Sequence, residues 1–205
     1  METETRVAKI ISYLFHPLLM PTYGFAFLFF TDNFIATFIS IDRKYIILGI
    51  TFVFTFLLPT INALILLKMG RIKSLEMEST QERIIPYSST AMYYFALVYL
   101  FYDADFPAIF KIVILAAGIS ILLTFIINFK WKISAHMIGI GGLAGATLGL
   151  MYRIDMDLQV ALITILFSSG IVGYARLKLN AHSPAQVYSG FIMGLLIELG
   201  LMLFY

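Results

Sequence analysis

Between Lys111 and Lys130 the chain reads IVILAAGISILLTFIINF over residues 112–129, which are 18 consecutive residues without a charge. A helix that crosses a bilayer needs about 20 predominantly apolar residues. Outward from this run, the charged side chains lie in or beside short breaks between similar apolar runs, because burying a charge in hydrocarbon costs several kcal/mol. Glu198, deep in the last run, is the exception. This pattern predicts a chain that crosses the membrane several times.

The composition agrees with this prediction. Of the 205 residues, 60% are hydrophobic and 13% are charged, whereas a soluble domain has about 45–50% apolar and about 25% charged residues. These values exclude a soluble enzyme with one anchor and a disordered chain, and the absence of cysteine excludes a disulfide-stapled secreted module. A net charge of +2 gives no support to a nucleic-acid partner.

The predicted fold is an all-α transmembrane bundle of six to seven spans that forms a single integral membrane domain over residues 1–205. Strict period-2 alternation is absent, which excludes a barrel. His16-Pro17 and Pro21 interrupt the first run, so residues 1–16 are expected to lie along the interface, and residues 103–105 are expected to form a tight turn. The spans are expected at roughly 10–30, 45–67, 87–102, 106–128, 135–152, 158–175 and 184–204.

Alternate counting of these spans places the N-terminus and the breaks at 68–86, 129–134 and 176–183 on one membrane face. This face carries ten of the 14 lysines and arginines, and the positive-inside rule predicts that it is cytoplasmic. If some of these lysines and arginines bind an anion, they raise the number of cations on this face for a reason unrelated to membrane orientation. No cleavable signal is evident at the N-terminus, so the first span is expected to remain in the protein.

The three breaks on this face carry residues suited to phosphate chemistry. Two of the three histidines, His136 and His182, are there together with Arg83 and Arg176. The guanidinium fork matches phosphate oxygens bidentately, an imidazole can attack phosphorus, and a second imidazole can protonate the departing oxygen. The residues predict phosphoryl transfer without a metal or another cofactor, since the histidines lie among cations and no carboxylate cluster accompanies them.

Two serines precede apolar runs beside these histidines. Ser134 and Ser183 are expected to be helix N-caps, so the free amides of two helix starts would point at one cavity. Two segments remote in sequence would then contribute to the same anion site.

The third break resembles a known signature. Arg176, His182 and Gln186 are separated by five and three residues. This spacing resembles the third signature of the type 2 phosphatidic acid phosphatase superfamily, in which a Ser-Arg pair is followed by histidine and aspartate. The chain is therefore similar to a family of membrane lipid phosphatases, with a divergent final position.

Two further blocks agree with this resemblance. Ser134-Ala135-His136 looks like the second signature, Pro-Ser-Gly-His, and Arg83 with Pro86 is similar to the end of the first, Lys-x6-Arg-Pro. The blocks occur in the family's order, and with their helices they cover residues from about 70 to the C-terminus.

The resemblance implies a role for each matching residue. His182 would be the nucleophile that becomes phosphorylated, and His136 would protonate the leaving alcohol. Arg83, Arg176 and the Ser134 hydroxyl would bind the phosphoryl oxygens.

A further basic residue is expected from the first signature. Lys73 is one candidate, although it lies ten positions before Arg83 instead of seven, and Lys132, two residues before Ser134, is the other. Both are also candidates for interfacial anchors.

The departure at Gln186 affects the expected activity. Glutamine can orient the His182 imidazole through a hydrogen bond but cannot neutralise a developing imidazolium. Glu82, next to Arg83, is a candidate for the missing carboxylate. Ser183-Pro184-Ala185-Gln186 also matches a capping box, and we favour this structural role for Gln186.

Two features within the spans have structural explanations. Gly141, Gly145 and Gly149 recur every four residues and predict a smooth helix face for close packing. Glu198 is either a functional intramembrane carboxyl or a protonated group hydrogen-bonded between helices, and the sequence favours neither.

Three functions are compatible with the sequence. The first is a membrane phosphatase that hydrolyses a lipid phosphate or pyrophosphate through a phosphohistidine, with membrane lipids as its surroundings. The second is a degenerate member of the same fold that binds or moves anionic lipids without cleaving them. The third is a small transporter, against which no inverted repeat is found and the polar residues gather at one surface instead of the midplane.

Overall fold

The computed structural model describes residues 2–31, 33–102, 104 and 106–204. Within these residues the secondary structure is helical, with no strand, and seven segments are long and apolar enough to cross a membrane. The prediction of an all-α bundle with six to seven spans is therefore confirmed, and the chain is a multi-pass integral membrane protein. The seven segments are Glu2–Phe30, Ile41–Lys68, Gln81–Tyr102, Ala108–Asn128, Ala135–Ile154, Gln159–Lys178 and Pro184–Phe204.

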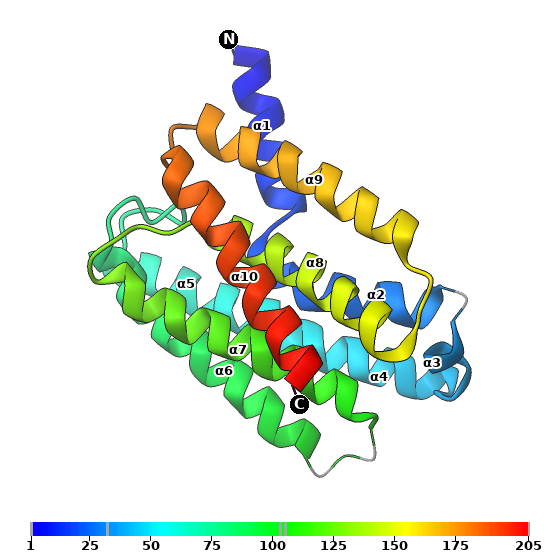
Figure 1. Cartoon of the computed structure of the whole chain (residues 1–205). Helices are drawn as coiled ribbons and strands as arrows, with labels where there is room; N and C mark the ends of the chain where they lie inside the picture. The colour runs from blue at the N-terminus through cyan, green and yellow to red at the C-terminus, as the bar shows by residue number, and fades with distance from the viewer. Residues whose placement is uncertain (1, 32, 103, 105, 205) are drawn as a thin grey trace.

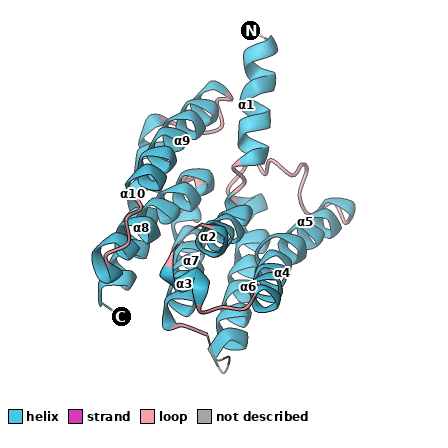
Figure 2. Ribbon diagram, turned by 90° about the vertical axis from the view of Figure 1, so that its right-hand side faces the viewer, coloured by secondary structure: helices cyan, strands magenta, loops and turns pink. Residues whose placement is uncertain are grey.

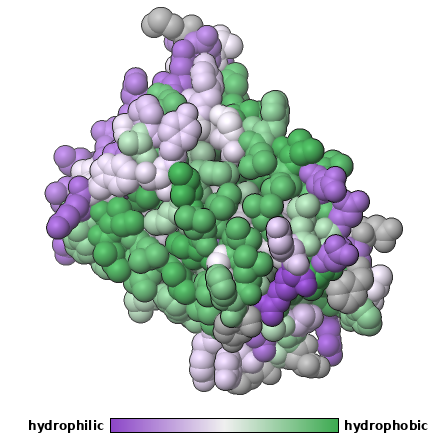
Figure 3. Space-filling model, in the orientation of Figure 1, coloured by the Kyte–Doolittle hydropathy of each residue, from purple (hydrophilic) through white to green (hydrophobic). Residues whose placement is uncertain are grey.

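The polarity of the surface agrees with a bundle that crosses a membrane. Figure 3 shows a broad hydrophobic surface between hydrophilic ends, which is the pattern expected where hydrocarbon surrounds the middle of a bundle.

In Figure 2, α8 (Ala135–Ile154), α9 (Gln159–Lys178) and α10 (Pro184–Phe204) lie on one side. On the other side lie α4 (Ile41–Phe52), α5 (Leu58–Lys68) and α6 (Ile84–Tyr102), with α2 (Met20–Phe30) and α7 (Ala108–Asn128) between the two groups.

The first segment is broken where the sequence predicts a break. Helix α1 (Glu2–Leu14) projects from the bundle and packs against α9 (Figure 1). A short 3-10 helix, η1 (Pro17–Leu19), then leads into α2, and the His16 side chain caps it by accepting a hydrogen bond from the Leu18 amide. Exposed apolar side chains on α1, including Val7 and Ile10, agree with the expected interfacial position.

The second segment contains a local irregularity. Between α4 and α5 the chain forms a π-helical turn, η2 (Val53–Leu57), which ends two residues before Pro59. A proline inside a helix has no amide hydrogen and its ring collides with the carbonyl four residues earlier, and a wider turn relieves both problems. Phe56 and Pro59 thereby come to line the main cavity of the protein.

The contact between α8 and α10 is the most extensive in the bundle, and glycines make it possible. A Cβ atom added to Gly141 would lie 2.2 Å from the Phe191 carbonyl oxygen, and one added to Gly145 would lie 2.4 Å from the Leu195 carbonyl oxygen. The predicted smooth face of α8 is therefore confirmed. Gly194 on α10 adds a reciprocal close approach, with 2.1 Å from its built Cβ to the Ile138 carbonyl oxygen.

Loops from three parts of the sequence meet at one end of the bundle. Residues 76–78, Lys132 and residues 178–182 all line one cavity, so the three breaks predicted to share a membrane face do share it. The side-chain amide of Asn128, at the end of α7, holds the first of these loops by donating to the Thr80 backbone carbonyl (2.7 Å). The turn expected at 103–105 includes two positions outside the described residues.

Candidate functional site

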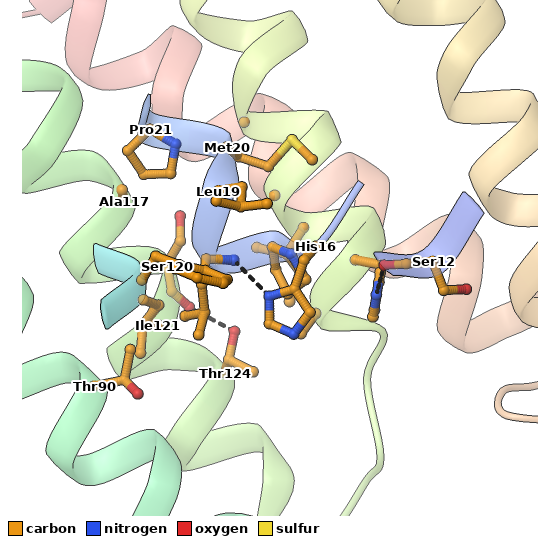
Figure 4. Close-up of a pocket in the computed structure, with 18 of the residues that line it drawn as sticks. Ser12, His16, Leu19, Met20, Pro21, Thr90, Ala117, Ser120, Ile121 and Thr124 are labelled. Carbon is orange, nitrogen blue, oxygen red and sulfur yellow. Dashed lines mark hydrogen bonds between the residues drawn. The ribbon is translucent and has the colours of Figure 1, made fainter. Parts of the chain in front are cut away.

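One large cavity of about 1190 Å³ lies inside the bundle, and Figure 4 shows part of its lining. It follows α8 from Ala135 to Leu150, a length of about 22 Å at the helical rise of 1.5 Å per residue. Its wall beside the three loops is cationic and carries imidazoles. Most of the remaining wall is apolar and comes from α2, α7 and α8. The polar residues at the loop end include Arg83, Lys132, His136, Arg176 and His182, together with Glu76 and Glu78.

The turn between α9 and α10 positions Arg176 and His182. Asn180 adopts a left-handed conformation (φ 50°), which asparagine tolerates better than most residues. The amides of Asn180 and Ala181 then bond to the carbonyls of Leu177 (2.9 Å) and Arg176 (3.1 Å), which closes the end of α9 in a Schellman motif. His182 follows directly and α10 begins two residues later, so the chain reverses within the site.

The hydrogen bonds of His182 leave one ring nitrogen free for chemistry. Its Nδ1 lies 3.1 Å from the Lys132 carbonyl oxygen and 3.3 Å from Oε1 of Gln186. Both partners are acceptors, so Nδ1 carries the hydrogen and Nε2 keeps its lone pair. Burial, followed by the positive charges of Arg83 and Arg176, lowers the pKa of His182 to about 4. The imidazole is therefore neutral at pH 7, as a nucleophile must be.

Gln186 has the structural role favoured from the sequence and also contacts the histidine. The side-chain Oε1 of Gln186 accepts from the Ser183 backbone amide (3.0 Å), and the backbone amide of Gln186 donates to the Ser183 hydroxyl (3.4 Å). This reciprocal pair is a capping box at the start of α10. The nearer partner of His182 is the Lys132 carbonyl, which the sequence did not indicate.

His136 is held by a different segment. Its Nε2 lies 3.0 Å from the carbonyl oxygen of Ser12, so Nε2 carries the hydrogen and Nδ1 is the nitrogen able to exchange a proton. The Ser12 hydroxyl also accepts from Nη1 of Arg176 (3.0 Å). One buried serine of α1 therefore fixes both an imidazole and a guanidinium of the site.

The two arginines keep donors available for a ligand. Arg83 is only 6% exposed, and it donates from Nε to the Met77 carbonyl (2.8 Å) and from Nη1 to the Tyr87 hydroxyl (3.3 Å). Arg176 has a buried Nε without a hydrogen-bond partner. A guanidinium carries five N–H donors, so several remain unused at each residue.

The positive charge of the site is not compensated by an ion pair. In the part of the chain that the structure describes, the one ion pair joins Lys178 to Glu4. Glu76 and Glu78 also line the cavity, but they form no ion pair with its cations within those residues. Burial and the nearby Arg83 lower the pKa of Lys132. A cluster of buried and partly buried cations that form no direct ion pair within the described residues favours an anionic ligand.

Three of the residues predicted for the site lie elsewhere than the sequence suggested. Lys73 is exposed and lies outside the cavity, whereas Lys132 lines it, so the geometry favours Lys132 as the additional cation. Ser134 occupies the N-cap position of α8, but its hydroxyl is completely buried without a partner and lies outside the cavity lining. The cause is close packing, since the Ser134 amide bonds to the Gln186 carbonyl (3.3 Å) where the two helix starts meet.

The third of these residues is Glu82. One carboxylate oxygen accepts from the Lys73 amide (2.8 Å) and the other from the Ser79 amide (3.2 Å) and the Ser79 hydroxyl (3.1 Å). The carboxylate thus organises the loop before α6 and does not orient His182.

Three residues of the cavity were missed by the sequence analysis as site residues. Ser12 and His16 come from the N-terminal segment, and Tyr87 comes from the start of α6. Tyr87 had a detectable signal, since it lies four positions from Arg83 and therefore on the same helical face. Ser12 and His16 belong to no motif, and only the packing of α1 brings them to the site.

Glu198 lies deeper in the same cavity. It is 4% exposed, one carboxyl oxygen has no hydrogen-bond partner, and its side chain lies beside Gly142, with Cγ 3.3 Å from the position of an added Cβ. No group of three or more potential metal-ligating side chains that could hold an ion occurs in the described ranges.

Comparison of the chain with protein-family models, curated proteins and solved structures finds no match. The case for a function therefore rests on the residues and geometry described above.

Proposed function

We propose that the protein is a membrane lipid phosphatase that works by the chemistry of the type 2 phosphatidic acid phosphatases. The observation that carries the proposal is a group of two imidazoles and three cations at one end of a cavity that is otherwise largely apolar. Within the described residues, these three cations form no ion pair. The family resemblance predicts these groups from three separate sequence blocks, and the fold brings the side chains of four of them, His136, His182, Arg83 and Arg176, to one cavity.

In the proposed first step, Nε2 of His182 attacks phosphorus and the bond between phosphorus and the lipid oxygen breaks. His136, which gains a proton at Nδ1 when the anionic phosphate binds, gives that proton to the departing oxygen, which leaves as an alcohol. Arg83, Arg176 and Lys132 stabilise the negative charge on the phosphoryl oxygens. The product is a phosphohistidine at position 182.

In the second step, a water molecule attacks the phosphohistidine and neutral His136 accepts a proton from it at Nδ1. Inorganic phosphate leaves, and both histidines return to their starting protonation states. The Ser12 carbonyl keeps its bond to Nε2–H of His136 in both states, because only Nδ1 exchanges the proton.

The shape of the cavity favours a lipid over a soluble phosphate. Its volume of about 1190 Å³ exceeds the usual 300–1,000 Å³ of small-molecule pockets. Apolar side chains such as Leu28, Val113 and Leu143 line the portion away from the charges. An acyl or prenyl chain would bury apolar surface there, which stabilises binding by about 25 cal/mol per Å².

A second function is favoured by the partners of His182. Its Nδ1–H faces a carbonyl and an amide oxygen, and neither can neutralise the imidazolium that forms as the nucleophile reacts. A protein with this site that binds or moves anionic lipids without cleaving them is the alternative.

The test is release of inorganic phosphate from dodecyl phosphate and dioleoyl phosphatidate by the purified protein in detergent. We expect turnover by the wild type and a loss of roughly 10³-fold or more in His182→Ala, as for removal of other enzymatic nucleophiles. Arg153→Met, at the other end of the bundle, is the matched control and should keep its activity. Equal turnover by wild type and His182→Ala would exclude the mechanism, and tight binding without turnover would favour the alternative.

A further inference from the structure

His16 is the third histidine of the chain, and no part of the proposed mechanism uses it. It lies at the break between α1 and α2 and lines the same cavity as His136 and His182. In Figure 4 its ring projects into the cavity, with Ser12 on one side and residues of α7 on the other. The centroids of the His16 and His136 rings are 5.7 Å apart, with the rings edge to face.

The bonding of His16 differs from that of the other two histidines. Its Nδ1 accepts a hydrogen bond from the Leu18 amide (3.4 Å), so this nitrogen carries the lone pair and Nε2 carries the hydrogen. In His136 and His182 the hydrogen of the neutral ring is held by a backbone carbonyl. The Nε2–H of His16 has no hydrogen-bond partner in the described part of the protein.

The neighbours of His16 belong to the anion site. Ser12, four residues earlier, accepts a hydrogen bond from Arg176 (3.0 Å) and from His136 (3.0 Å). The same short segment therefore fixes one arginine and one histidine of the site and presents an unused N–H donor beside them. A neutral donor suits this position, since it can bond to a phosphoryl oxygen without adding a fourth charge to Arg83, Lys132 and Arg176.

We propose that His16 is a further binding residue for the phosphate group, and that its Nε2–H donates a hydrogen bond to an oxygen of the bound phosphate monoester. This inference rests on the proposed lipid-phosphate site, although His16 itself belongs to none of the three sequence blocks. The N-terminal segment would then be part of the site and not only an interfacial anchor.

Two substitutions separate this role from the capping of η1. Asparagine at an N-cap accepts from the backbone through its side-chain oxygen, so His16→Asn keeps the acceptor for the Leu18 amide and removes the distal donor. Glutamine is a poor N-cap, but its longer side chain carries an N–H close to the place of Nε2. His16→Gln therefore loses the acceptor for the Leu18 amide and keeps the distal donor.

The experiment measures binding of dodecylphosphonate, which cannot be hydrolysed, to the full chain in detergent by titration calorimetry. Dodecanol, with the same chain and no phosphorus, is the matched ligand. A hydrogen bond to a charged group contributes about 1.5–3 kcal/mol, so we expect His16→Asn to weaken phosphonate binding by about 10-fold to 150-fold and to leave dodecanol binding unchanged. His16→Gln should retain tighter phosphonate binding than His16→Asn, despite a lower melting temperature.

The possible results separate this inference from the proposed function. If His16→Asn binds the phosphonate as tightly as the wild type, His16 only caps η1 and the inference is wrong, whatever the enzyme does. If the wild type prefers phosphonate, His16→Asn loses that preference and no phosphate is released from dodecyl phosphate, the inference stands and the hydrolytic function fails. A wild type that does not distinguish phosphonate from dodecanol has no phosphate site, and both proposals are then excluded.

Discussion

The cations at the two ends of the bundle differ in their partners. At the end away from the histidines, basic side chains donate to backbone carbonyls in the last turns of helices, which otherwise lack partners. These contacts are Lys44 Nζ to Phe29 (3.0 Å), Lys111 Nζ to Tyr102 (2.8 Å) and Arg153 Nη1 to Met202 (2.8 Å). At the histidine end, Arg83, Lys132 and Arg176 surround a cavity, and Arg176 keeps a buried nitrogen without a partner.

This difference separates stabilising cations from ligand-binding ones. A cation on helix-terminal carbonyls also interacts favourably with the negative end of the helix dipole, typically by about 0.3–1 kcal/mol. Three cations around one cavity repel one another, and an anion that enters relieves this repulsion. The first kind should therefore affect the free energy of unfolding, and the second kind should affect ligand binding and turnover.

Among substitutions of the cations, the largest expected effect is that of Arg176→Ala on turnover. Removing one preorganised donor to a developing charge costs about 10²–10³-fold in kcat, so kcat for dodecyl phosphate should fall by that factor. The melting temperature should change little, because relief of the repulsion from Arg83 offsets the lost hydrogen bond to Ser12. A variant that unfolds at much lower temperature and keeps full specific activity would place Arg176 among the stabilising cations.

The second prediction tests how the packing of α8 on α10 supports the histidine end. An added methyl at Gly141 would lie 2.2 Å from a backbone oxygen, which must move, and such overpacking costs about 1–3 kcal/mol. Gly141→Ala should therefore lower both the unfolding free energy in detergent and turnover, because His136 and His182 are set by this contact. Gly170, with no atom within 4 Å of an added Cβ, is the control, and Gly170→Ala should stabilise α9 by up to about 1 kcal/mol.

The sequence predicts those parts of this arrangement that leave a pattern over a short stretch of the chain. The spans follow from charge spacing, a local property, and the three site loops follow from counting those spans. Arg83, His136, Arg176 and His182 are identified because each lies in a short block with its own spacing.

The remaining site residues depend on tertiary contacts. Ser12 and His16 reach the cavity only because α1 turns back against α9, and no periodicity reports that path. Ser134 matches the motif, yet close contact between two helix starts seals its hydroxyl from the cavity. Lys73 is excluded because Glu82 fixes the loop that carries it.

The third prediction concerns pH and the charge around His182. The pKa of this group is lowered from 6.5 to about 4, so between these values the unfolded chain binds a proton that the folded protein does not. The contribution of His182 to stability is therefore present above pH 6.5 and is lost as pH falls toward 4. Arg83→Met should raise the pKa of His182 and flatten this dependence.

Unfolding midpoints at pH 4.5, 5.5 and 7.5 measure this effect. A shift of one pH unit corresponds to about 1.4 kcal/mol in the linked free energy. The same pH dependence in wild type and Arg83→Met would mean that Arg83 has no electrostatic influence on His182.

The smallest effect is expected at the other end of the bundle. Arg153→Met removes one hydrogen bond to a helix-terminal carbonyl, and the unfolding free energy should fall by about 1 kcal/mol. Turnover per folded molecule and phosphonate affinity should match the wild type. A loss of ligand affinity in this variant would erase the distinction between the two sets of cations.

The proposed mechanism requires His182 to receive the phosphoryl group inside this cavity. The sharpest test is rapid acid-free quenching of the wild type with radiolabelled dodecyl phosphate, followed by peptide mapping under alkaline conditions that preserve phosphohistidine. Label is expected on the peptide that contains His182, formed and lost at rates compatible with turnover. Steady release of phosphate with label on no histidine, or on His136 instead, would rule out this mechanism.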